Sequence, residues 1–234
     1  MVQAPFVITI DGPAGSGKTT TAKALAARLG FIYVDTGAMY RAVAYAVQSL
    51  GHAIDDAAAI SALVPDLDVR LELRDGAQHT LLNGENIEEF IRSQEMSKAA
   101  SDVSAIPAVR DAMVSLQRNA VKGTEGAILE GRDIGTVVFP DAPCKIFLVA
   151  DVRTRALRRK QQLEGKGMVV DLSVIEREIE ERDINDSTRE HSPLRKAPDA
   201  IEVETTNTSI EEQVSMILTL VEKRLRKVRG EDPA

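Results

Sequence analysis

The sequence predicts an α/β fold in which a five-stranded parallel sheet is flanked by helices. Three observations predict this class. Short apolar runs rich in β-branched residues alternate with segments of helical periodicity, a glycine-rich turn joins the first run to the first helix, and polar residues follow the runs directly. Because parallel sheets are buried on both faces, we expect these runs at the centre of the molecule.

The first four elements alternate between strand and helix. Residues 6–11 form an apolar run that leads into the glycine-rich turn, and residues 18–29 then place their apolar side chains at helical spacing. Gly30 is a suitable C-terminal stop for that helix. A second strand is predicted over residues 31–35 and a second helix over residues 36–51.

The pattern then changes to short antiparallel strands. Residues 66–87 contain short alternating stretches that are interrupted by an Asp-Gly dipeptide at 75–76 and an Asn-Gly dipeptide at 83–84. Both dipeptides are strong hairpin signals, because they tolerate the positive φ angles of tight turns. An antiparallel hairpin within an alternating chain is most simply an inserted subdomain, which we place at about residues 63–100.

The remaining elements complete the sheet. Helical periodicity resumes at Pro107, a residue suited to the first turn of a helix. Three further strands are predicted over residues 127–130, 145–150 and 200–204. Between the last two strands, residues 151–195 are dense in charge and offer little apolar surface, so we expect them to form helices on the outside that move easily.

The composition describes one ordinary globular chain. It has 234 residues, an apolar fraction of 44% and a formal net charge of -7. This length is typical of a single domain, which we expect to span residues 1–234. The longest apolar runs are far shorter than the roughly 18 residues that cross a membrane. No signal peptide is recognisable either, so we expect a cytoplasmic protein without a membrane partner.

Two further features narrow the classes of partner. The single cysteine, Cys144, cannot form an internal disulfide, which agrees with a reducing compartment. The acidic balance and the aromatic fraction of 3% disfavour nucleic acid as a partner, because nucleic-acid binding surfaces are usually basic and often use aromatic stacking. Any anionic ligand must therefore be bound by local clusters of Arg and Lys.

The glycine-rich turn carries the strongest functional signal. Residues 12–19, GPAGSGKT, match the phosphate-binding pattern G-x-x-x-x-G-K-[ST] in full, between a predicted strand and a predicted helix. The alternative is a tight turn with an exposed lysine, but the full match in this context favours a nucleoside triphosphate site. Lys18 would place its charge at the β- and γ-phosphates, and Thr19 would offer a hydroxyl to Mg²⁺. The predicted ATP-binding residues are Gly12, Pro13, Ala14, Gly15, Ser16, Gly17, Lys18, Thr19 and Thr20.

Acidic residues at strand ends are candidates for a second magnesium ligand. Glu130 directly follows a buried run, which is where the acidic partner of such a loop usually lies. Asp11 and Asp35 also follow strands and compete for this role. For Asp11 we favour capping or bracing of the phosphate-binding loop.

Arginines form a second constellation. Transfer of a phosphoryl group requires spread negative charge to be neutralised, and guanidinium groups do this well. Arg155 lies three and four residues from Arg158 and Arg159, so we expect one helical face to present all three as a lid over phosphate. A solvated charged face explains that run equally well by itself. The candidates are Arg41, Arg132, Arg155, Arg158, Arg159, Arg182 and Arg189.

Three classes of phosphate-loop protein remain: a small-molecule kinase, a GTPase or motor-type hydrolase, and a non-catalytic nucleotide sensor. No Asn-Lys-x-Asp element, which reads guanine in GTPases, occurs in the sequence. A nucleic-acid motor would need a longer chain with a basic track, and a sensor would have little use for so many arginines at strand ends. The kinase interpretation therefore explains the most residues.

Six segments together make the chain resemble the bacterial cytidylate kinases over essentially its whole length. The phosphate loop alone is not specific to that family, whereas the combination of segments is. They are ITIDGPAGSGKTT at the first strand and loop, DTGAMYRA (35–42), RSQEMSKAAS (92–101), PAVRDAM (107–113), EGRDIGTVVFPDAPCKIFL (130–148) and ERDINDSTRE (181–190).

This resemblance implies a phosphate-loop kinase of the adenylate kinase type, with a monophosphate-binding region enlarged by an insert and with a mobile lid. A monomer is the family expectation. The implied division is a core of about residues 1–35, 103–150 and 196–234, a monophosphate-binding region of about 36–102, and a lid of about 151–195.

The implied reaction is direct transfer of the γ-phosphoryl group of MgATP to CMP or dCMP. The alternative is another small-molecule kinase, such as a UMP/CMP or AMP kinase, and acceptor preference would separate the two. ATP, CMP and dCMP would be the partners and Mg²⁺ the cofactor. The residues implied in phosphoryl transfer are Lys18, Arg132, Arg155, Arg158, Arg159 and Arg189.

The resemblance also implies an acceptor site in three parts, for the phosphate, the base and the sugar. Asp133 can accept a hydrogen bond from the amino group of cytosine, whose ring acceptors Arg110 and Ser101 can satisfy. The implied set is Arg41, Arg132 and Arg189 for the phosphate, Ser101, Arg110 and Asp133 for cytosine, Arg182 with Asp186 for the sugar hydroxyl, and Thr36 and Tyr40 as further substrate-binding residues.

Overall fold

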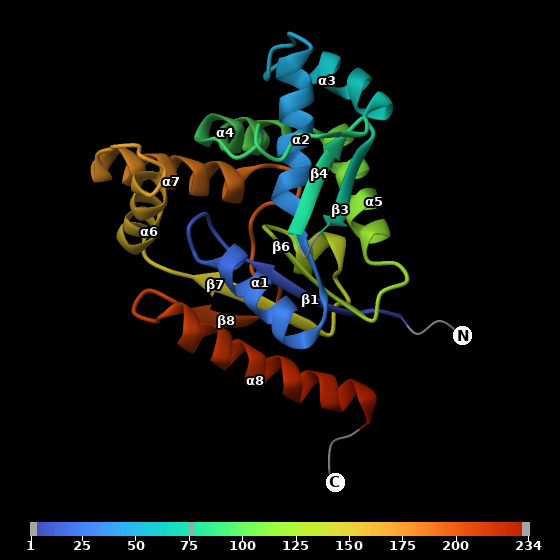
Figure 1. Ribbon diagram of the computed structural model, residues 1–234, viewed down its shortest axis with the longest axis vertical. Coiled ribbons are helices and arrows are strands. Elements are labelled where there is room, and N and C mark those ends of the chain that lie inside the picture. The colour runs from blue at the N-terminus through green and yellow to red at the C-terminus, as the bar shows by residue number, and fades with distance from the viewer. Residues whose placement is uncertain (1–3, 75–76, 231–234) are drawn as a thin grey trace.

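A five-stranded parallel sheet forms the centre of the molecule (Figure 1). The structure is a computed structural model and describes residues 4–74 and 77–230. The strands follow the spatial order β2-β6-β1-β7-β8, and every neighbouring pair is parallel, as the sequence predicts. Their bounds are β1 Phe6–Asp11, β2 Ile32–Asp35, β6 Gly126–Gly131, β7 Cys144–Val149 and β8 Ile201–Glu204.

Alternation along the strands divides the interior into two cores. Ile8 and Ile10 of β1 face one core, whereas Val7 faces the other, because successive side chains of a strand point to opposite faces. The first core is covered by α1 and α8 and the second by α2 and α5 (Figure 1). The helices are α1 Lys18–Leu29, α2 Thr36–Ser49, α5 Pro107–Ala120 and α8 Ile210–Arg229.

A small antiparallel sheet lies beside α2, within the region predicted as an insert (Figure 1). Asn83 and Gly84 turn the chain between two of its strands with φ angles of 50° and 86°, so the Asn-Gly turn is confirmed. The turn predicted at 75–76 lies outside the described residues. The elements here are α3 Ala57–Leu63, a 3-10 turn Val64–Asp66, β3 Val69–Arg74, β4 Ala77–Leu82, β5 Glu85–Asn86 and α4 Gln94–Val103.

The charged segment folds into two helices, α6 Val152–Glu164 and α7 Leu172–Thr188, at one side of the molecule (Figure 1). They share a small apolar core separate from the two main ones, formed by Ala156, Leu163, Ile175 and Ile179. The expected helices on the outside are thus present, while their movement stays a prediction. Within the described part of the chain, no helix is long and apolar enough to cross a membrane.

Candidate active site

The phosphate-binding loop, residues 12–19, turns at the C-terminal end of β1 into the N-terminus of α1. Gly12, Gly15 and Gly17 have φ angles of 149°, 77° and 92°, which side chains strongly disfavour. A Cβ atom at Gly12 would lie 2.3 Å from the carbonyl oxygen of Leu148, so only glycine fits there. The loop therefore brings backbone N–H groups and the positive end of a helix dipole to one place, which suits phosphate oxygens.

Lys18 is buried and folded across the loop. Its Nζ atom donates to the carbonyl oxygen of Pro13 at 2.6 Å. Burial lowers the pKa of Lys18 well below its ordinary value, and the positive charge of Arg132 lowers it further. A lysine in these surroundings is stabilised by an anion, as expected of a group that binds phosphate.

Thr19 and Glu130 are adjacent, and together they are the candidate magnesium ligands. The Thr19 hydroxyl donates to Glu130 Oε2 at 2.9 Å, and the Tyr33 hydroxyl donates to the other carboxylate oxygen. Burial raises the pKa of Glu130, and the nearby charge of Asp35 adds to this effect. A hydroxyl and a carboxylate are hard oxygen ligands of the type that Mg²⁺ prefers. In the described ranges no group of three or more His, Cys, Asp or Glu could hold a metal.

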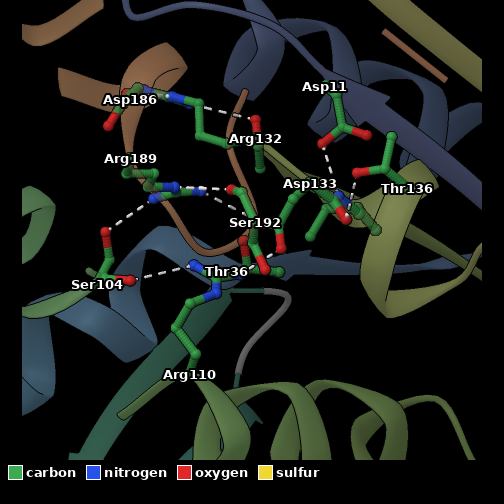
Figure 2. A network of polar contacts seen from close by, with 12 residues as sticks. Asp11, Thr36, Ser104, Arg110, Arg132, Asp133, Thr136, Asp186, Arg189 and Ser192 are labelled. Atoms are coloured by element: carbon green, nitrogen blue, oxygen red, sulfur yellow. Dashed lines mark hydrogen bonds and ion pairs between the residues drawn. The ribbon is translucent and has the colours of Figure 1, made fainter. Parts of the chain in front are cut away.

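Asp11 does not brace the phosphate-binding loop, and that expectation was wrong. Its carboxylate accepts the backbone N–H groups of Ile134 at 2.9 Å and Gly135 at 2.8 Å. These residues begin a π-helical turn, Ile134–Val138, which follows β6. Asp11 therefore holds the turn next to Asp133, which follows the neighbouring strand β6 (Figure 2).

Asp35, the other candidate, has different partners. One carboxylate oxygen caps α2 by accepting the Ala38 N–H at 3.0 Å. The other oxygen accepts from Arg41 at 2.9 Å and from Arg92 at 2.7 Å. Of the three acids that the sequence offers, Glu130 is thus the one in contact with Thr19.

A cavity of about 230 Å³ opens beside the phosphate-binding loop, and we call it the arginine cavity. Among the residues that the structure describes, Lys18 and six arginines line it, against four carboxylates. This excess of positive charge favours an anionic ligand. The charged lining residues are Lys18, Arg41, Arg92, Arg110, Arg132, Arg182 and Arg189 with Asp35, Glu130, Asp133 and Asp186, and the remaining predicted substrate residues Thr36, Tyr40 and Ser101 lie between them.

Arg110 and Asp133 form a buried ion pair in this cavity. Arg110 also donates to the Ser104 carbonyl oxygen at 3.3 Å and lies over the ring of Tyr40, 5.6 Å from its centroid (Figure 2). The pair presents a carboxylate acceptor and guanidinium donors to the cavity, Arg110 from α5 and Asp133 from the start of the turn that follows β6. Thr36, a further predicted substrate-binding residue in the cavity lining, donates its hydroxyl to the Glu130 carbonyl oxygen at 2.5 Å.

The side chain of Arg189 is held in place by hydrogen bonds to two serines. Its Nε atom donates to the Ser192 carbonyl oxygen at 2.7 Å and its Nη1 atom to the Ser104 hydroxyl at 2.9 Å (Figure 2). Ser192 adopts a left-handed φ of 51°, which is uncommon for serine. Arg189 also lies 3.9 Å from an oxygen of Asp133. A strained turn after α7 thus positions this arginine beside the buried ion pair.

Asp186 of α7 joins three predicted site residues. It accepts from Arg132 Nε at 2.8 Å and from the Ser101 hydroxyl at 2.9 Å, and Arg182 lies 3.8 Å away. Burial opposes ionisation of Asp186, but the positive charges of Arg132 and Arg182 outweigh it and lower its pKa to about 2. Asp186 of α7 thus contacts both α4, through Ser101, and the residue that follows β6, Arg132.

The three arginines of α6 do not share one exposed face, so that expectation was wrong for Arg155. Arg155 is buried, donates to the Ala14 carbonyl oxygen at 3.1 Å and pairs with Asp183 at 2.6 Å. Arg155 therefore supports the phosphate-binding loop through the Ala14 carbonyl oxygen. Arg158 and Arg159 do line an open cleft of about 1070 Å³ that also reaches the loop.

Sequence reasoning missed four residues around the site. Arg92 opens one of the recognised segments but gave no local signal of a role. The contacts of Tyr33, Ser104 and Ser192 depend on partners far along the chain. The residue types near these positions in the sequence do not indicate which distant group each side chain contacts.

The fold and the site together define a phosphate-loop phosphotransferase, with a triphosphate-binding loop at the C-terminal edge of a parallel sheet and a cationic cavity beside it. The sequence profile of cytidylate kinase matches residues 8–223. The chain therefore belongs to the cytidylate kinase family.

Two relatives agree with this assignment, and a solved structure shares the fold. A cytidylate kinase of Listeria welshimeri is 49% identical over 219 residues, which cover 93% of this chain and 96% of the relative. A cytidylate kinase of Syntrophotalea carbinolica is 47% identical, with 94% and 93% covered. The crystal structure of a gluconokinase from Sinorhizobium meliloti has a TM-score of 0.50 at 13% identity and covers 99% of both chains, so the likeness concerns the fold alone.

Proposed function

We propose that this chain transfers the γ-phosphoryl group of MgATP to CMP or dCMP, giving ADP and CDP or dCDP. One observation carries the proposal. The open cleft and the arginine cavity both include Lys18 in their lining, so a triphosphate in the cleft and a monophosphate in the cavity meet at that residue. Family membership supplies the expectation of a cytidine nucleotide as the acceptor.

Arg110 and Asp133 support recognition of cytosine. The base presents an amino donor, which the Asp133 carboxylate accepts, and ring acceptors, which Arg110 and Ser101 satisfy. Uracil would instead present a carbonyl oxygen to the carboxylate, leaving both acceptors unpaired. Unpaired buried polar groups give strong discrimination between substrates.

Sugar and phosphate are bound next to the base. Asp186 and Arg182 would hold a sugar hydroxyl, since Asp186 is a fixed carboxylate at the cavity wall. Arg41, Arg132 and Arg189 would bind the acceptor's phosphate. Their guanidinium groups surround one space, so they also orient the acceptor oxygen that attacks.

The reaction needs no protein nucleophile. An oxygen of the acceptor's phosphate forms the new bond to the γ-phosphorus in line with the β-γ bridging oxygen, whose bond breaks as ADP leaves. The acceptor's phosphate is already anionic, so no general base is required. Lys18 and the arginines stabilise the charge on the transferring group.

The donor is held by the phosphate-binding loop. Its backbone N–H groups and Lys18 contact the triphosphate, and Arg155 keeps the loop in shape through the Ala14 carbonyl oxygen. Thr19 and Glu130 would hold Mg²⁺, which neutralises charge on the donor's phosphates when bound. Arg158 and Arg159 line the cleft and would close over the donor as α6 and α7 move, which excludes water.

The decisive experiment measures ADP formation from MgATP with CMP, dCMP, UMP, AMP or no acceptor in parallel. We expect CMP and dCMP to exceed the others by about 100-fold or more in kcat/KM. A preference for another monophosphate would reassign the base pocket but keep the kinase. ADP formation that no acceptor accelerates would remove the kinase function altogether. Light scattering in the same buffers would test the expected monomer.

A further inference from the structure

Arg92 is the one arginine of the described cavity lining to which the proposed function gives no role. It follows the small sheet β3–β5 and lies just before α4. Its side chain is 36% exposed, yet it lines the arginine cavity together with Arg41. A long cationic side chain that reaches the cavity from the segment after the small sheet is unexpected if this region only covers apolar surface.

Two carboxylates fix the guanidinium group of Arg92. Its Nη1 atom donates to Asp35 Oδ2 at 2.7 Å, and its Nε atom donates to Glu88 Oε1 at 2.6 Å, with Nη2 on the same oxygen. A guanidinium has five N–H donors, so two remain available for an oxygen ligand. The group is therefore oriented but not saturated.

Glu88 is itself fixed by the small sheet. Its second carboxylate oxygen accepts from the Thr80 backbone N–H at 3.1 Å and from the Thr80 hydroxyl at 2.8 Å. Thr80 belongs to β4 and is fully buried. The position of Arg92 is thus set by the small sheet on one side and by Asp35 at the end of β2 on the other. Such two-sided support is typical of pre-organised binding groups.

Asp35 brings Arg92 and Arg41 together. The same oxygen of Asp35 that accepts from Arg92 also accepts from Arg41 Nη2 at 2.9 Å. The two guanidinium groups therefore lie next to each other on one carboxylate oxygen. Burial opposes ionisation of Asp35, but the charges of Arg41 and Arg92 outweigh it and lower its pKa. One carboxylate oxygen therefore serves two cations, whereas a phosphate group could offer each its own oxygen.

We propose that Arg92 binds the acceptor's phosphate alongside Arg41, so that the segment between the small sheet and α4 contributes a ligand to the acceptor site. This inference rests on the proposed function, because it requires a nucleoside monophosphate in the arginine cavity. A phosphate oxygen accepts from one of the two remaining N–H donors of Arg92, while Asp35 keeps its contact with Nη1 and Glu88 keeps its contacts with Nε and Nη2. The excess of cations over carboxylates in the cavity is then offset by the dianionic ligand.

The first test compares CMP with cytidine, which lacks the phosphate, by calorimetry. Arg92→Gln should weaken CMP binding about 10- to 100-fold, because a charge-assisted hydrogen bond is lost. Cytidine binding should change less than about twofold, since the base and sugar contacts remain. The matched control is Arg70→Gln, which removes an exposed arginine paired with Asp68 on the same small sheet and should alter neither affinity.

A double-mutant cycle separates direct contact from action through Arg41. If Arg92 binds phosphate itself, adding Arg92→Gln to Arg41→Gln weakens CMP binding further, by about tenfold. If Arg92 only positions Arg41 through Asp35, the second substitution has no further effect, and the inference is wrong. Thermal unfolding of each variant checks that the fold is kept.

The remaining outcomes are also decisive. Equal losses for CMP and cytidine, or no loss for CMP, would overturn the role of Arg92. A wild-type protein that binds neither ligand would instead overturn the proposed function. Should Arg92→Gln not fold, Arg92→Lys keeps the charge but cannot span both carboxylates, and it should weaken CMP about three- to tenfold without affecting cytidine.

Discussion

The phosphate-binding loop and the arginine cavity are adjacent but are built in different ways. The loop is eight consecutive residues whose shape follows from three glycines with positive φ angles. The cavity is formed by side chains from α2, α4, α5, β6 and α7, which ion pairs hold in place. Local backbone geometry therefore specifies the first part, and long-range charge pairing specifies the second.

The difference predicts different responses to substitution. A single substitution in the loop should affect either phosphoryl transfer or the backbone conformation of the loop, because the loop residues are consecutive in the chain. In the cavity, one change should leave partner charges buried and unpaired, so selectivity and stability respond together.

Lys18→Ala should give the largest effect. We expect kcat to fall at least about 1,000-fold, since the charge at the transferring phosphoryl group is lost. The fold should persist, because the Nζ atom donates to the Pro13 carbonyl oxygen and carries a charge that burial already disfavours. Lys23→Ala is the matched control, as that lysine lies on the exposed side of α1. Unchanged turnover of Lys18→Ala would reject the role of the loop.

Gly12→Ala tests the backbone argument. The added Cβ would meet the Leu148 carbonyl oxygen at 2.3 Å, at a φ of 149°. We expect the free energy of unfolding to fall by about 3 kcal/mol and ATP affinity to fall with it. Gly30→Ala has a φ of 67° but no atom within 4 Å, so it should lose only about 1 kcal/mol. Urea unfolding of both variants measures the difference, and equal losses would show that the close contact is unimportant.

Asp133→Asn tests the cavity. The amide keeps the size of the side chain but leaves Arg110 without its carboxylate partner. We expect the preference for CMP over UMP to fall about 30-fold, with the KM for ATP unchanged, because the amide can donate to uracil. Asp141→Asn is a suitable control, since that side chain is exposed and lies outside the described lining of both spaces. A retained preference would remove Asp133 from base recognition.

The sequence predicted what depends on local pattern. The five strands of the parallel sheet, the Asn-Gly turn and the glycine-rich loop all follow from hydrophobic periodicity and residue type within a few positions. It could not predict that Arg155 turns under the loop or that Asp11 holds the turn after β6, because both depend on which distant backbone groups remain unpaired. Arg92 was missed for the same reason.

Two carboxylates near these regions, Asp11 at the end of β1 and Asp186 in the cavity, should respond to pH with opposite sign. Burial raises the pKa of Asp11 to about 6, although the N–H groups of Gly135 and Ile134 oppose it. The unfolded value is near 3.8, so between these values the folded protein binds a proton that the unfolded chain does not. Protonation of Asp11 should therefore raise the free energy of unfolding by about 1 kcal/mol as the pH falls from 7 to 5.

Asp186 behaves in the opposite way, because its folded pKa of about 2 lies below the unfolded value. Its contribution is complete above the unfolded value and is lost only as the pH falls toward 2, so it is silent in the range where Asp11 titrates. Urea unfolding of wild type and Asp11→Asn at pH 7, 6 and 5 isolates the effect. The variant should be less stable at every pH, because its amide cannot accept both N–H groups, but the gap to wild type should widen on acidification. A gap that stays constant from pH 7 to 5 would mean that Asp11 titrates normally, and that the end of β1 tolerates a buried charge as well as the cavity does.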